Sequence, residues 1–544
     1  MKTFYLFTAL IAVNFIGFAQ FTTTTYRGAF APAPTAMWTD DWTEFNPQTK
    51  VYPTPNVVIS ANITANTTWT TGNTYELTVP IYVKNNATLT IQPGVIVRGK
   101  IAGAGLFITR GAKLIAEGTA TSPIVFTSGN AVNFRNRGDW GGIVLLGKGS
   151  YNINGGFNYI EGIAQSDDTK FGGEATPDDN DNSGTLKYVR IEFAGFTYGA
   201  AGSNTEINGL TMGACGKQTK VDYVQVSYSN DDSFEWFGGS NSSTYLVALN
   251  GLDDDFDVDN GWSGNVQFCL AVREPSAADT SDSNCFETDN NSTSLDGTNH
   301  TRGTFSNCTL IGPDYRKTLP NTGTFNVRHR RAAHMRRNTK LRIHNSIFMD
   351  FVDGVVIDGA TTIANANASN GLKFKNNIIA GTATAKIATT TAPTTFDVAT
   401  WFTTNMNTSQ ALSAGLLTTP YNTTDGSIYT GLDYRPATGS VALSGADFTE
   451  ITASLGTGNL ISDDNILISY PNPFTNSFRV TFDSVDTNNI NLNVYDVTGR
   501  IVETRNFDYD NINNQEFGNN YQSGMYIMVL KQGDYTKSLR IIKR

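Results

Sequence analysis

Short runs of β-forming residues alternate with turn residues along most of this chain, and a helical period is absent almost throughout. Between about residues 56 and 382, Gly, Asn and Asp separate runs such as 87–91, 112–116, 123–126 and 142–146. The runs recur in irregular repeats of roughly 20 to 30 residues, a spacing typical of solenoids. The pattern predicts an all-β body whose coils stack on one another.

Two interleaved sets of strands can be aligned within this region. The first set covers 188–191, 223–226, 245–248, 266–269, 305–308, 343–346 and 374–377. The second set covers 232–235, 254–257, 284–287, 333–336 and 354–357. Each coil would then give a strand to at least two parallel sheets, and only stacking would bury its apolar face. We therefore predict a right-handed parallel β-helix. A β-propeller or stacked sandwiches would give more regular hairpin signals than this sequence contains.

The alignment also predicts which side chains stack. One inward column would contain Phe234, Phe256, Phe286 and Met335. A ladder of amides at a turn would contain Asn307, Asn345 and Asn376. Cys269 and Cys308 would occupy equivalent places on adjacent rungs, where either a disulfide or two free thiols would fit.

The opening coils, at 62–69, 87–94 and 111–120, resemble those of Bacteroidota surface β-helix proteins of the pectin-lyase-like superfamily. The resemblance covers residues 58–385. It implies the fold but no particular activity, because this architecture carries lyases, hydrolases, adhesins and inert stalks.

The end of the chain carries a second set of motifs. These are Tyr-Pro-Asn-Pro-Phe at 470–474, Val-Tyr-Asp-Val-Thr-Gly-Arg at 494–500, an apolar run at 524–530 and a basic end at 540–544. They resemble the type A C-terminal sorting domain of the type IX secretion system of Bacteroidota. The resemblance implies export by the type IX machinery. Short strands and a Gly-containing turn predict a small immunoglobulin-like β-sandwich, and a generic immunoglobulin-like binding module is the alternative.

The start of the chain agrees with export. Lys2 precedes an apolar run that ends near Phe18, with a small residue at Gly17 and at Ala19, as in a secretory signal peptide. No run reaches the roughly 20 apolar residues that a transmembrane helix needs. We expect an extracellular or outer-surface protein. Its parts would be a signal peptide at 1–19, an N-terminal extension or cap at 20–57, the β-helix at 58–385, a C-terminal cap and linker at 386–462, and the sorting domain at 463–544.

Composition narrows the possible partners. Charged residues are only 16% of the 544, and the net charge of −10 argues against general nucleic-acid binding. Four cysteines are too few for a disulfide scaffold. The four histidines match no common zinc-site spacing.

Acidic residues form the first candidate site. In the alignment Glu235, Asp257 and Glu287 share an outward column, with Asp232 over Asp254 and Asp259 over Asp289. Neighbouring strands lie about 4.8 Å apart, so these charges repel and need a cation, hydrogen bonds or raised pKa values. Calcium suits oxygen ligands. The predicted calcium ligands are Asp232, Glu235, Asp254, Asp257, Asp259, Glu287 and Asp289; the alternative is that these carboxylates cap turns or pair with arginines.

Basic residues form the second candidate site, and Arg336 would continue the acidic column. The predicted anion ligands are Arg328, Arg330, Arg331, Arg336 and Arg337. They would either neutralise the carboxylates or bind a uronate, sulfate or phosphate. Trp236 and Trp262 would stack on a sugar or pack in the core.

These features support three functions of different classes. The first is a non-catalytic module that binds a glycan or another anionic ligand, or that mediates adhesion. The second is a lyase or hydrolase of acidic polysaccharides, in which Asp257 and Glu287 would hold a cation and Arg336 would act as base. The third is a purely structural surface protein. The sequence contains no nucleophile motif, so we favour binding over catalysis.

Overall fold

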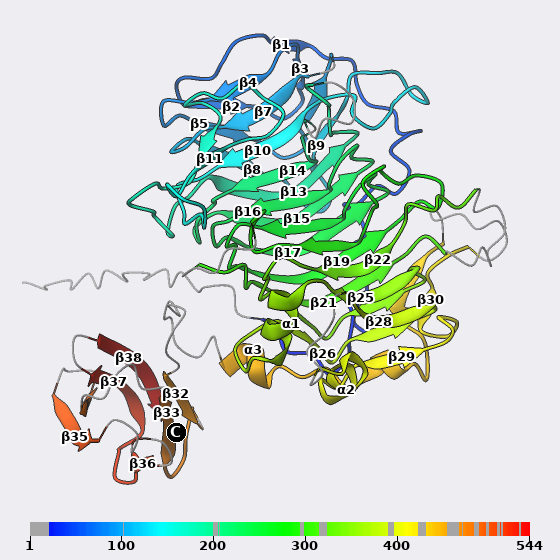
Figure 1. Ribbon diagram of the computed structural model, residues 1–544. Helices are drawn as coiled ribbons and strands as arrows, with labels where there is room; N and C mark the ends of the chain where they lie inside the picture. The colour runs from blue at the N-terminus through cyan, green and yellow to red at the C-terminus, as the bar shows by residue number, and fades with distance from the viewer. Residues whose placement is uncertain are drawn as a thin grey trace, which may run out of the picture.

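The computed structural model shows an elongated β-helix and a separate small β-domain (Figure 1). It describes residues 21–101, 103–199, 205, 207–293, 299–314, 324–389, 396–422, 431–453, 467–470, 472–482, 489–496, 500–508, 512, 515–532 and 535–544. The predicted signal peptide at 1–19 lies outside the described residues.

One long parallel sheet contains ten strands, one from each successive coil. From the N-terminal end it runs β4 (Ile81–Val83), β7 (Gly105–Ile108), β10 (Gly142–Leu146), β14 (Leu210–Gly213), β16 (Phe234–Phe237), β18 (Phe256–Asp259), β20 (Phe286–Thr288), β22 (Arg331–Met335), β25 (Asp353–Ile357) and β28 (Thr384–Ala388). We call it the ten-stranded sheet. It carries the candidate site on its outer face.

The rest of each coil forms two further stacks of parallel strands. The first stack contains β2 (Thr67–Trp69), β5 (Thr88–Ile91), β8 (Lys113–Glu117), β23 (Arg342–His344) and β26 (Lys373–Lys375). The second contains β1 (Val57–Ile59), β3 (Thr74–Leu77), β6 (Ile96–Gly99), β9 (Ile124–Ser128), β24 (Ile347–Met349), β27 (Ile378–Ala380) and β29 (Thr408–Gln410). Five long strands join the stacks: β13 (Gly184–Glu192), β15 (Lys220–Ser227), β17 (Ser242–Leu249), β19 (Asn265–Val272) and β21 (Thr304–Ile311). The prediction of a parallel β-helix is confirmed.

A column of residues with positive φ marks the corner between these two stacks. The predicted Asn ladder lies there, with φ of 56° at Asn307, 54° at Asn345 and 58° at Asn376. Asn tolerates the left-handed region better than other residues with a Cβ. Aromatic residues continue the same corner, and Tyr223 stacks on Tyr245 with ring centroids 4.3 Å apart. The structure corrects our alignment here, because Cys269 lies beside Leu246 and not beside Ala248.

The inward column of the ten-stranded sheet begins as predicted. Phe234 pairs with Phe256, and Phe256 pairs with Phe286. Their ring centroids are 5.7 and 5.1 Å apart, and all three side chains are fully buried. The prediction for Met335 was wrong: Ala333 follows Phe286, and Met335 pairs with Thr288.

The N-terminal extension does not cover the first coil, as a cap would. It runs along the side of the β-helix and reaches its C-terminal coils. Gly28 donates to the carbonyl of Asn345 at 2.7 Å, and Trp42 packs edge-on against Tyr223. Phe21 is buried with Phe448 and Ile451. The extension therefore connects coils that are far apart in the sequence.

Helices and a final strand pair lie at the C-terminal end of the solenoid. The helices are α1 (Ala360–Asn367), α2 (Val398–Thr404), the 3-10 helix η1 (Val441–Leu443) and α3 (Thr449–Ala453), and β30 (Leu417–Thr419) pairs with β31 (Asp433–Pro436). Trp401 and Phe402 of α2 join the main core. Since β29 pairs with β27, parallel pairing extends beyond residue 385, where we expected the β-helix to end.

The C-terminal domain contains two antiparallel sheets around its own core. One sheet is β32 (Leu467–Tyr470), β33 (Phe478–Phe482) and β36 (Glu516–Phe517); the other is β35 (Ile501–Phe507), β34 (Ile490–Asp496), β37 (Gly524–Gln532) and β38 (Tyr535–Lys543). Phe478 and Val480 from the first sheet pack with Leu492 and Met528 from the second. This is the small β-sandwich that the sequence predicted.

The β-helix also carries an inserted pair of short strands and four cysteines. An insertion between β10 and β13 contains the antiparallel pair β11 (Asn158–Tyr159) and β12 (Lys170–Phe171). Cys269 and Cys308 pair in register, as predicted. All four cysteines are buried free thiols. Of the two states that the sequence allowed for Cys269 and Cys308, the structure therefore shows free thiols.

Candidate functional site

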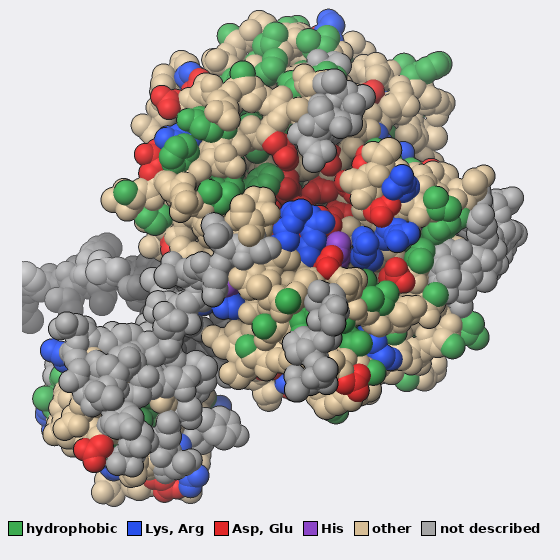
Figure 2. Space-filling model, in the orientation of Figure 1, with side chains coloured by type: hydrophobic (Ala, Val, Ile, Leu, Met, Phe, Trp, Pro, Cys, Tyr) green, Lys and Arg blue, Asp and Glu red, His purple; other side chains and the backbone are tan. Residues whose placement is uncertain are grey.

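Carboxylates gather on the outer face of the ten-stranded sheet. Alternation along β16 turns Phe234 and Trp236 into the core, and therefore turns Glu235 outward. Register places Glu235 beside Asp257 of β18, and Asp257 beside Glu287 of β20, as predicted. Figure 2 shows acidic side chains in a hollow of this face, with basic side chains and a histidine along its border. We call this site the acidic hollow and define it by Asp231, Asp232, Glu235, Asp253 and Asp257.

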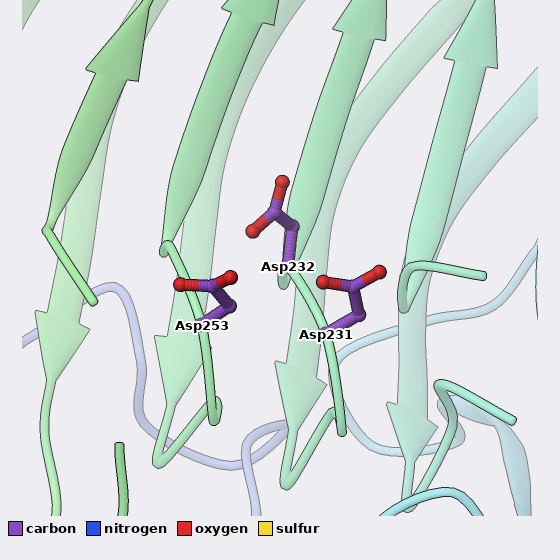
Figure 3. A group of neighbouring side chains, drawn as sticks. All are labelled: Asp231, Asp232 and Asp253. Carbon is purple, nitrogen blue, oxygen red and sulfur yellow. The ribbon is translucent and has the colours of Figure 1, made fainter. Parts of the chain in front are cut away.

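Two groups of three carboxylates share Asp232 in the acidic hollow. The carboxylate oxygens of Asp232, Glu235 and Asp257 lie within 4.8 Å of one another. Oxygens of Asp232, Asp231 and Asp253 also lie within 4.8 Å of one another. These three side chains converge from the turns that lead into β16 and β18 (Figure 3). The predicted set omitted Asp231 and Asp253. Their positions beside Asp232 and Asp254 in the sequence were the available signal.

Protein groups compensate the carboxylates of the acidic hollow unevenly, and the backbone N–H of Asp254 donates to Asp232 at 2.9 Å. Oδ1 of Asp257 is buried and has no hydrogen-bond partner within the described residues. Asn208 donates to Glu235, and Ser281 donates to Asp253 at 2.8 Å. Burial, followed by repulsion from neighbouring carboxylates, raises the pKa values of Asp232, Glu235 and Asp257 well above the ordinary range. A bound cation would replace the hydration that these carboxylates lose on burial and would offset their mutual repulsion.

Asp254 and Asp259, also predicted as ligands, lie beside the acidic hollow. The backbone and the side-chain amide of Asn284 both donate to Asp254. Burial, followed by repulsion from Glu287, nevertheless raises the pKa of Asp254 to about 7. Asp259 accepts from the side chain of Asn260 at 3.1 Å, and its Oδ1 is buried without a partner among the described residues. The carboxylate of Asp254 therefore has more hydrogen-bond donors than the carboxylate of Asp257.

A buried ion pair positions the turn that carries Asp253. Arg273 contacts Asp255 at 3.0 Å, and both side chains are almost fully buried. Arg273 also donates to the carbonyl of Asn284 at 2.6 Å and to those of Leu252 and Asp253. Its guanidinium therefore connects the turns before β18 and β20. Removing it would leave the charge of Asp255 buried without a partner.

The remaining predicted calcium ligands, Glu287 and Asp289, bind arginines. Arg336 contacts both carboxylates, and its Nε lies 2.7 Å from Asp289. Arg337 contacts Asp289 at 2.6 Å. The structure corrects the predicted column, because His334 and not Arg336 lies beside Glu287 on β22. His334 is 3.3 Å from Glu287 through Nδ1 and 3.2 Å from Asp358 through Nε2.

The other predicted anion ligands lie at the rim and have acidic or amide partners. Arg328 and Arg330 both contact Asp282, at 3.1 and 3.7 Å. Arg331 donates to the side chain of Asn284 at 3.3 Å. The side chains of Arg328, Arg330 and Arg337 keep 52%, 41% and 43% of their surface exposed, which leaves donors for a ligand.

Of the two roles predicted for Trp236 and Trp262, the structure shows packing in the core and not stacking on a sugar. Both are fully buried in the main core, with ring centroids 5.5 Å apart. Trp262 donates its indole N–H to the carbonyl of Asn241. Trp236 lies two residues after Phe234, so it shares the inward face of the strand.

The chemistry of this arrangement favours binding a hard cation over transferring a proton. Several carboxylate oxygens converge without enough hydrogen-bond donors, which suits calcium. Arg336 is a poor general base, because Glu287 and Asp289 outweigh the effect of burial and raise its pKa. Arginine side chains beside these carboxylates suit an anionic ligand.

Comparisons with known proteins agree with this architecture. A family model described as a pectate-lyase like beta helix domain matches residues 61–421. A second, described as a secretion system C-terminal sorting domain, matches residues 469–544. A comparison with curated proteins found no match, and a comparison with solved structures found none either. No helix in the described part of the chain is long and apolar enough to span a membrane.

Proposed function

Since this chain belongs to the pectate-lyase-like β-helix family, we propose that its acidic hollow binds calcium and, with the neighbouring arginines, an anionic glycan. The C-terminal domain is a type IX sorting domain, so the protein is exported to the cell surface or the medium. Anionic glycans are among the polymers that an exported bacterial protein meets. The proposed role is binding or adhesion without cleavage.

The buried oxygen of Asp257 carries the proposal for calcium. It faces a neighbourhood of carboxylates, with oxygens of Asp232 and Glu235 within 4.8 Å, and it has no partner among the described residues. Uncompensated burial of one charge costs several kcal/mol, so such a site needs a proton or a cation. Asp232, Glu235 and Asp257 would hold the ion. When bound, calcium supplies positive charge that attracts carboxylate or sulfate groups of a glycan.

The border of the acidic hollow supports an anionic ligand. Arg337 is half exposed while it contacts Asp289, so its remaining N–H groups can donate to a glycan. Arg330 is similarly exposed near Asp282. Cleavage by a lyase would need a base that loses its proton near neutral pH, and the ion pairs of Arg336 oppose that role.

The test is binding of the purified full-length chain to polygalacturonate, alginate, chondroitin sulfate and neutral dextran, with calcium and with chelator. We expect at least one acidic polysaccharide to be retained with calcium, released by chelator and left intact. Asp257→Asn should reduce calcium-dependent retention at least tenfold. Glu117→Gln, which changes an exposed carboxylate on β8, is the matched control and should bind normally.

Each other outcome rejects a defined part of the proposal. Unsaturated products that absorb in the ultraviolet would identify a lyase. Retention that is unaffected by chelator and by Asp257→Asn would reject calcium in the acidic hollow. Absence of binding to every polysaccharide would favour a structural role.

A further inference from the structure

One face of the sorting domain is divided into an apolar half and a polar half. The four-stranded sheet β35-β34-β37-β38 buries one face in the domain core, through side chains such as Leu492 and Met528. Its other face is exposed. Alternation along β37 places Met525 and Ile527 on this outer face and Tyr526 on the inner one.

The apolar half is continuous across all four strands. Tyr495 of β34 pairs with Ile501 of β35 on one side and with Ile527 of β37 on the other. Met525 pairs with Ile542 of β38 in the next row. We call these five residues the tail patch. Ile501, Met525 and Ile527 are 52%, 42% and 36% exposed, although each is a large hydrophobic side chain.

The polar half of the same face is satisfied by its own hydrogen bonds. Thr504 donates to Asn493 at 2.7 Å, and Asn493 donates to Asn491 at the same distance. Asn491 in turn donates to Asn506 at 2.6 Å. This network lies further along the same strands than the tail patch. The exposed apolar groups are therefore confined to one end of the sheet, where β37 begins and β38 ends.

Positive charge borders the tail patch. Ile527 pairs with Arg540, which is exposed, and the basic residue Arg544 follows the last residue of β38. Arg500, which pairs with Asp496 at 3.0 Å and keeps its side chain 78% exposed, immediately precedes Ile501. Clustered apolar surface with a charged rim is typical of a protein–protein interaction site. A partner that covers it needs an apolar surface with an acidic rim.

We propose that the tail patch is the surface by which the type IX export machinery recognises this chain. The partner is the component that contacts the sorting domain, and its contact surface is apolar with acidic residues around it. The sorting domain matches a family defined by secretion, so the machinery is the partner that this domain must meet. The inference does not depend on calcium or glycan binding by the acidic hollow.

The test is export of full-length variants from a Bacteroidota host that has a type IX system, measured by immunoblots of periplasm, cell surface and medium. Ile527→Glu and Met525→Glu should each lower the exported fraction at least tenfold and leave the chain in the periplasm. Arg540→Glu should lower it about threefold, because it reverses one charge of the rim. Thr504→Glu, on the polar half of the same face, is the matched control and should export normally.

Folding of the tail is measured separately. Proteolysis and circular dichroism of each purified chain should match the parent, because the changed side chains are exposed. Ile527→Thr keeps a β-branched side chain and removes apolar area, so it should also reduce export. Export of a folded Ile527→Glu chain at the parental level would overturn the proposal. So would equal losses of export in the Thr504→Glu control.

Discussion

Replacing Asp257 by Asn would test the physical argument for the acidic hollow. The substitution removes one negative charge from a column of carboxylates and changes the shape of the side chain very little. Because Oδ1 of Asp257 has no hydrogen-bond partner among the described residues, no bond to that atom is lost. We expect the variant to be more stable than the parent when no cation is bound.

The magnitude follows from the spacing of the rungs. Two unit charges about 4.8 Å apart repel by about 0.9 kcal/mol in bulk water and by about 3.5 kcal/mol at an effective dielectric constant near 20. Asp257 faces Glu235 and Asp232, and Asp259 adds to the repulsion, whereas Arg336 offsets the charge of Glu287. The free energy of unfolding in chelator should therefore rise by about 1–3 kcal/mol at pH 8.

Calcium should narrow this difference in stability, and reverse it where the difference in chelator is below about 2 kcal/mol. A ligand present at about 100 times its dissociation constant stabilises the native state by about 2.7 kcal/mol. The parent should gain this amount, and Asp257→Asn should gain less than about 0.5 kcal/mol, because it lacks one ligand.

Urea unfolding followed by tryptophan fluorescence measures both effects. All seven tryptophans lie between Trp38 and Trp401, so the signal reports the β-helix and not the sorting domain. Glu117→Gln should match the parent in both conditions. The reasoning fails if Asp257→Asn is less stable than the parent in chelator and gains as much from calcium.

Three further predictions concern the fold and its response to pH. Phe256→Ala should lower the free energy of unfolding by about 3–5 kcal/mol in urea, whereas Val58→Ala, at an exposed site, should change it by less than about 0.5 kcal/mol. Asn345→Ala should be less stable than Asn345→Gly by about 1–2 kcal/mol, because φ is 54° and both variants lose the same side chain; equal stabilities would contradict the corner assignment. In chelator, the native state binds protons more tightly than the unfolded chain, since the pKa values of Asp232 and Glu235 are raised and that of Asp254 is about 7. Stability should therefore fall as pH rises from about 4 toward 7, a slope that denaturation at several pH values measures and that calcium should flatten.

The sequence by itself determined the class of fold, the sorting domain and the acidic column of the candidate site. Recurring turn residues and two interleaved strand sets were sufficient to predict a parallel β-helix, and motifs at the chain end identified the tail. The pairing of Glu235, Asp257 and Glu287 also followed, because each of these strands begins with a Phe that directly precedes the acidic residue.

Only the tertiary structure decided the register where the turns vary in length. A two-residue shift leaves the alternation of inward and outward side chains unchanged, so the pattern could not distinguish His334 from Arg336 beside Glu287. The same ambiguity misplaced Met335 and the partner of Cys269.

The structure also decided which charges remain uncompensated. Arg336 and Arg337 bind Glu287 and Asp289, and Asp257 keeps a buried oxygen without a partner among the described residues. Charge pairing depends on which long side chains reach across rungs from different turns, and that depends on packing rather than on local sequence. For the same reason Asp231 entered the acidic hollow unpredicted, since the position of its turn is set by the coils above and below it.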